Sequence, residues 1–278
     1  MLLFLRMSRA SRSAAVALGA HKCKHCGRIA FDVGEEPVAR LVRHFIEEPR
    51  LCSYLADRKA SLEYRLMVDV SPHELEGLLL RGWRRFGPAY FRPACRQCSE
   101  CHSIRLDVHR FAPTSSQQRA LRRSRRFRVE VGRPHIDPER LALHEEWHHT
   151  REAARGWEPT NLSEDEYATQ FAFPSATGSE MAWYDGGKLV ALGLVDLTPN
   201  CLSAAYFFYH PSIARLSPGV ANVMRCVELA RELGCQHVYL GYRVEGCDSL
   251  RYKGAFRPHE LLDGRPALDE KAVWKEVT

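Results

Sequence analysis

Four cysteines have the spacing expected of metal ligands. Cys95, Cys98 and Cys101 follow one another at intervals of three residues, and Cys52 stands in an earlier segment. Three thiolates at this spacing can surround one ion, and a fourth from a distant loop completes a tetrahedral site. Zinc and an iron–sulfur cluster both suit such ligands, and the spacing does not distinguish them. The alternative is a set of buried free thiols.

A second pair of cysteines is a weaker metal signal. Cys23 and Cys26 are followed by Gly27, which suits the tight turn of a metal knuckle. Two ligands do not make a site, so this pair could join the same ion, join a second ion or hold nothing. We expect the scattered remainder to be core or surface thiols, namely Cys201, Cys226, Cys235 and Cys247.

A histidine pair raises a competing hypothesis, that of a zinc peptidase. His144 and His148 stand one helical turn apart with Glu145 after the first, which is the H-E-x-x-H pattern. The glutamate would act as general base, and Glu164 or Glu166 could supply a third ligand. The chain has 13 histidines, however, and the helix is polar on most faces, which favours a chance match.

An arginine-rich stretch over 119–133 contains one acidic residue, Glu130. Guanidinium groups bind phosphate bidentately, so the stretch favours contact with a nucleic-acid backbone over a solvated helix face or linker. Arginine without lysine points towards RNA. The residues expected to make this contact are Arg119, Arg122, Arg123 and Arg126.

A cluster of polar and aromatic residues follows a strand near the C-terminus. The strand ends at Tyr242, and Tyr252, Lys253, Arg257 and Glu260 come after it. Such a cluster could hold an anionic substrate and position proton donors. The alternative is that the tyrosines only pack against the core.

Two helices are expected around these groups. Ser71 is an N-cap with Pro72 at the first helical position and Glu74 as capping-box partner, and this helix ends near Gly82. A second helix is expected from Asp137-Pro138 to about Ala154.

The second half of the chain has a strand, helix and strand pattern. Residues 181–210 predict a β-meander with turns at 185–187 and 198–200. A helix over 217–234 and a strand over 237–242 follow. This order predicts an α+β fold with a mixed sheet.

Length and composition are those of a globular protein. The chain has 278 residues, 45% of them hydrophobic and 27% charged, which favours two modest domains or one large one and argues against disorder. The net charge of +6 permits an anionic partner. The expected divisions are a leader over 1–40, a cysteine-bearing domain over 41–112, a basic linker or arm over 113–136 and a sheet domain over 137–278.

The sequence predicts no association with a membrane. It has no run of eighteen apolar residues, so no transmembrane span is expected. The apolar start is broken by Arg6, Arg9 and Arg12, which does not suit a secretory signal, and Met7 is an alternative start. We therefore expect a cytoplasmic protein.

Taken together, the segments resemble the aminoacyl-tRNA–protein transferase family, which includes eukaryotic arginyltransferases and bacterial aspartate/glutamate leucyltransferases. The resemblance runs from about Cys52 to Gly264. Its markers are Cys52-x-Tyr54-Leu55, Arg81-Gly-Trp83-Arg84-Arg85, Tyr90-x-Arg92-Pro93-x-Cys95-x-x-Cys98-x-x-Cys101, Ile104-Arg105, Leu202-Ser203-Ala-Ala-Tyr206-x-Phe208, Tyr239-Leu240-Gly241-Tyr242 and Tyr252-Lys253-x-x-Phe256-x-Pro258-x-Glu260.

The resemblance implies a cysteine-rich N-terminal domain and a C-terminal GNAT-like acyltransfer domain. It implies transfer of an amino acid from aminoacyl-tRNA to the α-amine of proteins with N-terminal Asp or Glu, which marks them for degradation. Leucyl transfer is favoured and arginyl transfer is the alternative. From another class, the cysteines and arginines also suit a non-catalytic, metal-stabilised RNA-binding protein.

The implied chemistry needs no cofactor and no covalent nucleophile, because the aminoacyl ester is already activated. A structural zinc or iron–sulfur cluster would most simply hold the N-terminal domain. Its thiolates could also line the acceptor pocket or sense oxidation, which would be a redox role. Positioning of substrates, stabilisation of the oxyanion and protonation of the leaving hydroxyl remain for the enzyme. We assign catalysis to Tyr206, Tyr252 and Tyr242, and substrate binding to Arg92, Lys253, Arg257 and Glu260.

The chain departs from the family pattern in a few places. Ala56 replaces a proline, Arg243 an aromatic residue and His210 an aspartate. An Arg-His pair of the family appears here as Arg151-Glu152. These departures bear on the choice of donor.

Overall fold

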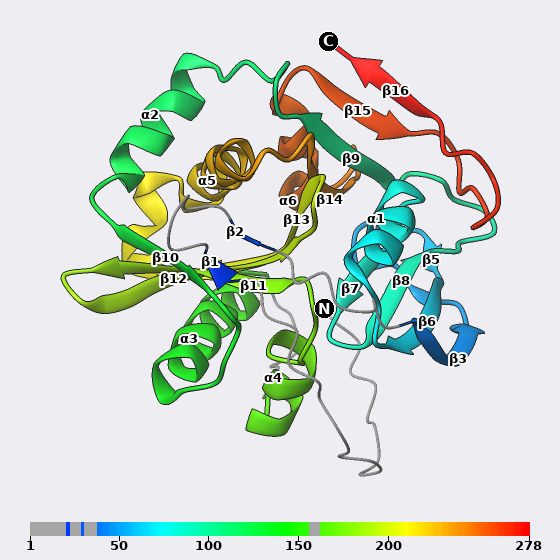
Figure 1. Ribbon diagram of the computed structural model, residues 1–278, viewed down its shortest axis with the longest axis horizontal. Coiled ribbons are helices and arrows are strands. Elements are labelled where there is room, and N and C mark those ends of the chain that lie inside the picture. The colour runs from blue at the N-terminus through cyan, green and yellow to red at the C-terminus, as the bar shows by residue number, and fades with distance from the viewer. Residues whose placement is uncertain (1–20, 23–28, 31–37, 156–161) are drawn as a thin grey trace.

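The computed structural model describes residues 21–22, 29–30, 38–155 and 162–278 (Figure 1). Cys23 and Cys26, and most of the expected leader, lie outside the described residues. Two short stretches of the leader pair as antiparallel strands, β1 (His21–Lys22) and β2 (Ile29–Ala30).

A small sheet and one helix form the N-terminal module. The sheet has the strand order β3 (Arg40–Ile46), β6 (Leu62–Val68), β8 (Ala89–Pro93) and β7 (Arg84–Phe86), and a hairpin of β4 (Arg50–Leu51) and β5 (Lys59–Ala60) lies beside it. Helix α1 (Pro72–Leu80) has the expected capping box between Ser71 and Glu74. It buries Leu75, Leu78 and Leu79 against Trp83.

A mixed sheet of eight strands forms the rest of the fold. In spatial order it comprises β10 (Arg128–Gly132), β11 (Gly178–Asp185), β12 (Lys188–Leu197), β13 (Cys201–Tyr209), β14 (His237–Arg243), β9 (His102–Asp107), β15 (His259–Leu262) and β16 (Trp274–Val277). Neighbouring strands are antiparallel except β13 and β14. The expected meander and the α+β class with a mixed sheet are confirmed.

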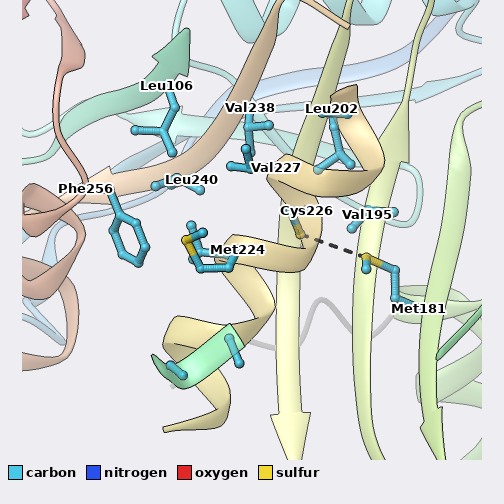
Figure 2. Close-up of a cluster of buried hydrophobic side chains, with 14 of the residues drawn as sticks. Leu106, Met181, Val195, Leu202, Met224, Cys226, Val227, Val238, Leu240 and Phe256 are labelled. Atoms are coloured by element: carbon cyan, nitrogen blue, oxygen red, sulfur yellow. Dashed lines mark hydrogen bonds between the residues drawn. The ribbon is translucent and has the colours of Figure 1, made fainter. Parts of the chain in front are cut away.

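Helices cover both faces of the large sheet (Figure 1). On one face lie α2 (Ser115–Ser124) and α5 (Pro218–Leu233), and on the other lie α3 (Pro138–Arg155) and α4 (Glu164–Phe171). Because side chains alternate along a strand, Met181 joins the core under α5, where Cys226 contacts it (Figure 2), and Ala182 joins the core under α3. Short helical turns complete the chain, namely η1 (Pro211–Leu216), α6 (Asp248–Arg251) and η2 (Tyr252–Ala255).

Two segments are placed differently from the expected divisions. Residues 113–136, expected to be a basic linker, contain α2 and β10, and the buried Ala120 and Phe127 tie them to the large core. A capping box between Thr114 and Gln117 starts α2. Strand β9, from the range assigned to the cysteine-bearing domain, lies inside the large sheet between β14 and β15.

The central parallel pair, β13 and β14, separates along its length. The two strands pair only from Cys201 to Ser203 with His237 to Tyr239, although they continue to Tyr209 and Arg243. A register shift in β13 around Ala205 accompanies the separation. The gap opens towards the N-terminal module. In the described residues, no helix is both long and apolar enough to span a bilayer.

Candidate active site

A cavity of about 1220 Å³ lies where β13 and β14 separate. Its walls come from both strands, from α3, α4 and the start of α5, and from the N-terminal module. Side chains that carry chemistry line it from several elements: His148 and Glu152 of α3, Tyr206 of β13, Arg84 of β7, and Tyr252 and Lys253 of η2. The cavity is therefore our candidate active site.

A phenol and an imidazole meet in this cavity. The Tyr206 hydroxyl lies 3.0 Å from Nε2 of His148, and Nδ1 of His148 lies 3.5 Å from Oε1 of the buried Glu152. The Tyr206 ring is stacked on Phe171, which fixes its orientation. Burial lowers the pKa of His148, and Glu152 partly opposes this shift. The imidazole is thus neutral near pH 7 and can accept a proton.

The zinc-peptidase hypothesis gains no support from the same helix. His144 packs against Tyr167, Phe171 and Phe208, and burial lowers its pKa to about 3. The side chain of Glu145, the base of that hypothesis, is 68% exposed. Within the described residues, no group of three or more His, Cys, Asp or Glu side chains is placed to hold a metal ion.

Two cationic side chains share the cavity without a carboxylate partner. Arg84 is buried and donates to Ser203 Oγ at 3.0 Å and to the carbonyl oxygen of Ala204. Lys253 is partly buried and donates to the carbonyl oxygen of Tyr242 at 3.1 Å. No carboxylate of the described residues forms an ion pair with either. Burial, and then the charge of Arg84, lower the pKa of Lys253 to about 7.

Unpaired buried cations are costly, so their presence in a cavity indicates an anionic ligand. Gly241 of β14 lies beside the Arg84 guanidinium. A Cβ at Gly241 would be in ordinary contact with Arg84 at 3.5 Å, so the backbone φ of +84° is what favours glycine there.

The other two predicted catalytic tyrosines have different positions. Tyr252 is 39% exposed at the cavity wall. Tyr242 is buried, and its hydroxyl donates to the carbonyl oxygens of Gly82 at 2.9 Å and Phe91 at 3.3 Å. Those bonds join β14 to the N-terminal module, so the hydroxyl supports the structure, and Tyr242 also lines the cavity.

We expect the Tyr242→Phe variant to be less stable. Removal of the hydroxyl leaves two carbonyl oxygens without this donor and should lower the free energy of unfolding by about 1–3 kcal/mol. Urea unfolding of wild type and variant measures the difference. Tyr209→Phe is the control, because the Tyr209 hydroxyl has no hydrogen bond to any described residue, and it should leave stability unchanged. Equal stability of all three proteins would contradict this role.

Three predicted substrate-binding residues lie away from the cavity. Arg92 is bonded to Glu63 at 2.7 Å and to the carbonyl oxygen of Pro266, and Arg257 donates to the carbonyl oxygen of Thr278. Glu260 is paired with Arg105, Nε to Oε2, at 2.6 Å. The structure therefore brings only Lys253 of this predicted set into the cavity.

The predicted tRNA-binding arginines lie on the surface of and beside α2. Arg119, Arg122, Arg123 and Arg126 are exposed. Arg126 is paired with Asp185 at 2.7 Å, while the first three form no ion pair with a described residue. They present positive charge on the face of α2 turned away from the core.

The four predicted metal ligands line one end of the cavity. Burial, and then the nearby thiols of Cys95, Cys52 and Cys98, raise the pKa of Cys101 to about 12. Their positions do not form a metal-binding group among the described residues. Coordination would require the thiols to move closer together, so the metal site stays a prediction.

Sequence reasoning missed the roles of Arg84, His148 and Glu152 in the cavity. Arg84 was only one member of a matching segment, and His148 was assigned to a peptidase pattern. The spacing of His148 and Glu152 by one helical turn was the available signal, because it places them on one face of a helix. Only the fold reveals that this face meets Tyr206.

The cavity combines a proton acceptor with cationic groups. The relatives of the chain identify it as a transferase. The chain belongs to the arginine-tRNA-protein transferase family. Residues 50–119 match the family model described as its N terminus, and residues 139–263 match the one described as its C terminus.

Two bacterial relatives agree with this assignment. The chain is 32% identical over 227 residues to a protein named aspartate/glutamate leucyltransferase from Campylobacter jejuni, covering 81% of this chain and 95% of that one. A protein of the same name from Helicobacter hepaticus is 30% identical over 237 residues, 85% and 98% of the two chains. Among solved structures, L-PGS from Bacillus licheniformis matches 52% of this chain and 47% of its own at 12% identity and a TM-score of 0.40.

Proposed function

We propose that this protein transfers leucine from leucyl-tRNA to the α-amine of proteins that begin with Asp or Glu. The observation that carries the proposal is the pair of cations, Arg84 and Lys253, without a carboxylate partner in the cavity. An acidic side chain of the acceptor supplies the missing negative charge, with about 1.5–3 kcal/mol for a charge-assisted hydrogen bond. Lys253 keeps the role assigned from the sequence, and Arg84 takes the role assigned to Arg257.

The proton relay acts on the acceptor amine. An α-ammonium group has a pKa of about 7.7–8.0 and loses a proton readily. The amine attacks the ester carbonyl and passes a proton to the Tyr206 oxygen, while Tyr206 passes its own proton to Nε2 of His148. The carboxylate of Glu152 stabilises the imidazolium. When the ester bond breaks, the same proton returns through Tyr206 to the ribose oxygen.

The charges in the cavity favour leucine over arginine as the donor. Arg84, Lys253 and Arg151 all line the cavity, and they would repel a second guanidinium group. Aromatic side chains from Phe86, Phe91 and Phe171 offer apolar surface for a branched aliphatic side chain. The names of the relatives point the same way. Arginyl transfer remains the alternative donor reaction.

A transfer assay tests the proposal. Purified protein is supplied with tRNA charged with radiolabelled leucine or arginine, and with peptides that differ only in a first residue of Asp, Glu, Asn or Ala. Label should move from leucyl-tRNA to the Asp and Glu peptides alone. Transfer from arginyl-tRNA only would establish the alternative donor. Binding of tRNA without any transfer would contradict the proposal and favour the non-catalytic RNA-binding protein.

The exposed arginines of α2 are proposed to bind the tRNA backbone. Replacing Arg119, Arg122 and Arg123 together by glutamine should weaken tRNA binding and reduce the slope of log affinity against log salt by about one for each phosphate that is no longer neutralised. Arg125→Gln is the control, since Arg125 is already paired with Glu228 at 3.1 Å. If the triple variant kept the wild-type slope of log affinity against log salt, these arginines would not be the tRNA-binding residues.

The remaining expectations follow from these substrates. Aminoacyl-tRNA is made in the cytoplasm, where we propose that the protein acts, and the added leucine would mark the acceptor for degradation.

We also propose that Cys52, Cys95, Cys98 and Cys101 hold a structural metal. Metal analysis of anaerobic and aerobic preparations tests this: zinc in both excludes a redox role, and a metal-free, fully active protein contradicts the site.

A further inference from the structure

The two cations of the cavity carry more positive charge than their surroundings balance. Burial, and then the charge of Arg84, lower the pKa of Lys253, so the two cations lie close together. Asp196 is a carboxylate whose charge acts on Arg84, but it is already bonded to Arg85 at 3.0 Å. The pair therefore presents two positive charges to a ligand.

Two further acidic groups that line the cavity have partners of their own. Oε1 of Glu152 lies 3.5 Å from Nδ1 of His148, and Asp248 is paired with Arg251 at 2.6 Å. Neither carboxylate forms an ion pair with the two cations. An acceptor with a single negative charge would neutralise one cation and leave the other unpaired, which is costly in a partly buried site.

Most N–H groups of the two cations are not used by described residues. A guanidinium has five N–H donors and an ammonium has three. Arg84 donates to Ser203 Oγ at 3.0 Å and to the carbonyl oxygen of Ala204. Lys253 donates to the carbonyl oxygen of Tyr242 at 3.1 Å. The remaining donors exceed the acceptor sites of one carboxylate, which has two oxygen atoms with about four lone pairs.

A phosphate monoester matches both the charge and the donors. It carries a charge of about −1.5 to −2 near pH 7 and has three terminal oxygen atoms that accept hydrogen bonds. In phosphoserine, the phosphorus atom is as many bonds from Cα as the carboxyl carbon is in glutamate. A phosphate on a first residue of serine therefore reaches as far as the carboxylate of a first residue of glutamate. The cavity of about 1220 Å³ leaves room for the larger group.

We propose that proteins beginning with phosphoserine are acceptors, with the phosphate dianion bound by Arg84 and Lys253 together. The inference rests on the proposed function, because it extends the acceptor class of the same site. The α-amine forms a bond to the leucyl carbonyl carbon, the ester bond to the ribose oxygen breaks, and that oxygen takes the proton that the amine loses. No bond to phosphorus changes. Such an N-terminus is produced by phosphorylation of a serine and cleavage of the peptide bond before it.

Four peptides that differ only in the first residue test the proposal, namely phosphoserine, O-sulfoserine, Glu and Ser. O-sulfoserine is the matched control, because it has the shape of phosphoserine with a single negative charge. At pH 7 phosphate is mostly dianionic, since its second pKa is about 6. Leucyl transfer to the phosphoserine peptide should then have a kcat/KM at least about tenfold above those of O-sulfoserine and Glu. A phosphoserine peptide used no better than O-sulfoserine or Ser would overturn the proposal.

Lys253→Met removes one of the two charges. The kcat/KM values for phosphoserine and O-sulfoserine should come within about twofold of each other, while the KM for leucyl-tRNA keeps its wild-type value. The melting temperature should not fall, because an unpaired buried charge is lost. Lys253→Arg and Lys275→Met keep both charges of the pair and should keep the advantage of phosphoserine. A raised KM for leucyl-tRNA with an unchanged phosphoserine advantage in Lys253→Met would place a donor phosphate at this pair and overturn the proposal.

Calorimetry with the same peptides distinguishes failure of the inference from failure of the proposed function. Transfer to Asp and Glu peptides without transfer to phosphoserine would remove the inference alone. Binding can also be measured when no transfer occurs. Tighter binding of phosphoserine than of O-sulfoserine, lost in Lys253→Met, without leucyl transfer to any peptide would uphold the dianion site and remove the proposed function.

Discussion

Replacement of His148 by glutamine is expected to lower kcat for leucyl transfer about 10²–10⁴-fold, the usual contribution of a positioned general base. Glutamine retains a hydrogen-bonding group near Tyr206 but cannot accept the proton that the amine releases. Single-turnover measurement at saturating leucyl-tRNA isolates this step. KM for the peptide should change little, because His148 does not contact the acidic side chain in the proposed mechanism.

His149→Gln is the matched control for this prediction. The neighbouring imidazole is 54% exposed and lies 4.0 Å from Glu145 on the outer face of α3. Its loss should leave kcat within about twofold, as for a surface substitution. Glu152→Gln should give an intermediate loss, because a neutral amide stabilises the imidazolium less than a carboxylate does. If His148→Gln were as fast as the control, the proposed proton transfer through Tyr206 to His148 would be contradicted.

Replacement of Lys253 by methionine is expected to lower the efficiency of transfer to acidic acceptors. The variant keeps much of the side-chain volume but loses the charge that faces the acidic acceptor. For an Asp peptide, kcat/KM should fall about 10–100-fold, while transfer to the matched Asn peptide should hardly change. Lys275→Met is the control, since Lys275 is an exposed residue paired with Asp263 at 2.8 Å. An undiminished preference for Asp in Lys253→Met would contradict the assignment.

The same lysine predicts a pH dependence of acceptor binding. With a pKa lowered to about 7 by burial and by Arg84, Lys253 loses its proton as the pH rises above 7. Only the protonated form attracts the carboxylate, so KM for the Asp peptide should rise with pH from 7 to 9 in the wild type. Lys253→Arg stays charged over this range, and its KM should be flat. The facing thiol of Cys247 opposes the shift and is the other titratable group acting on Lys253.

Local signals predicted the individual elements well. The capping box at Ser71 and the turn at 185–187 are each formed by residues that are close together in the sequence. For this reason α1 and the hairpin of β11 and β12 could be located from the sequence. Helix α2 was harder to predict, because its sequence is rich in arginine and few apolar residues, such as Ala120 and the nearby Phe127, mark a buried face. The Thr114 capping box was the overlooked signal.

Long-range placement could not be predicted in the same way. Strand β9 inserts beside β14 across more than a hundred residues of sequence, and no local pattern encodes that pairing. Arg84 and Lys253 are similarly distant in the sequence, and only the separation of β13 from β14 brings them into one cavity. Arg257 was assigned to the site for its charge alone, and the fold directs it to the C-terminal strand instead.

The proposed mechanism gives one cavity two separable tasks, proton transfer and recognition of an acidic acceptor. The most direct test is single-turnover leucyl transfer to peptides that differ only in a first residue of Asp or Asn, by wild type, His148→Gln and Lys253→Met. We expect His148→Gln to slow transfer to both peptides equally and to keep the preference for Asp, whereas Lys253→Met should lose that preference. Wild-type rates and preference in both variants would contradict the proposed mechanism and place the reaction outside this cavity.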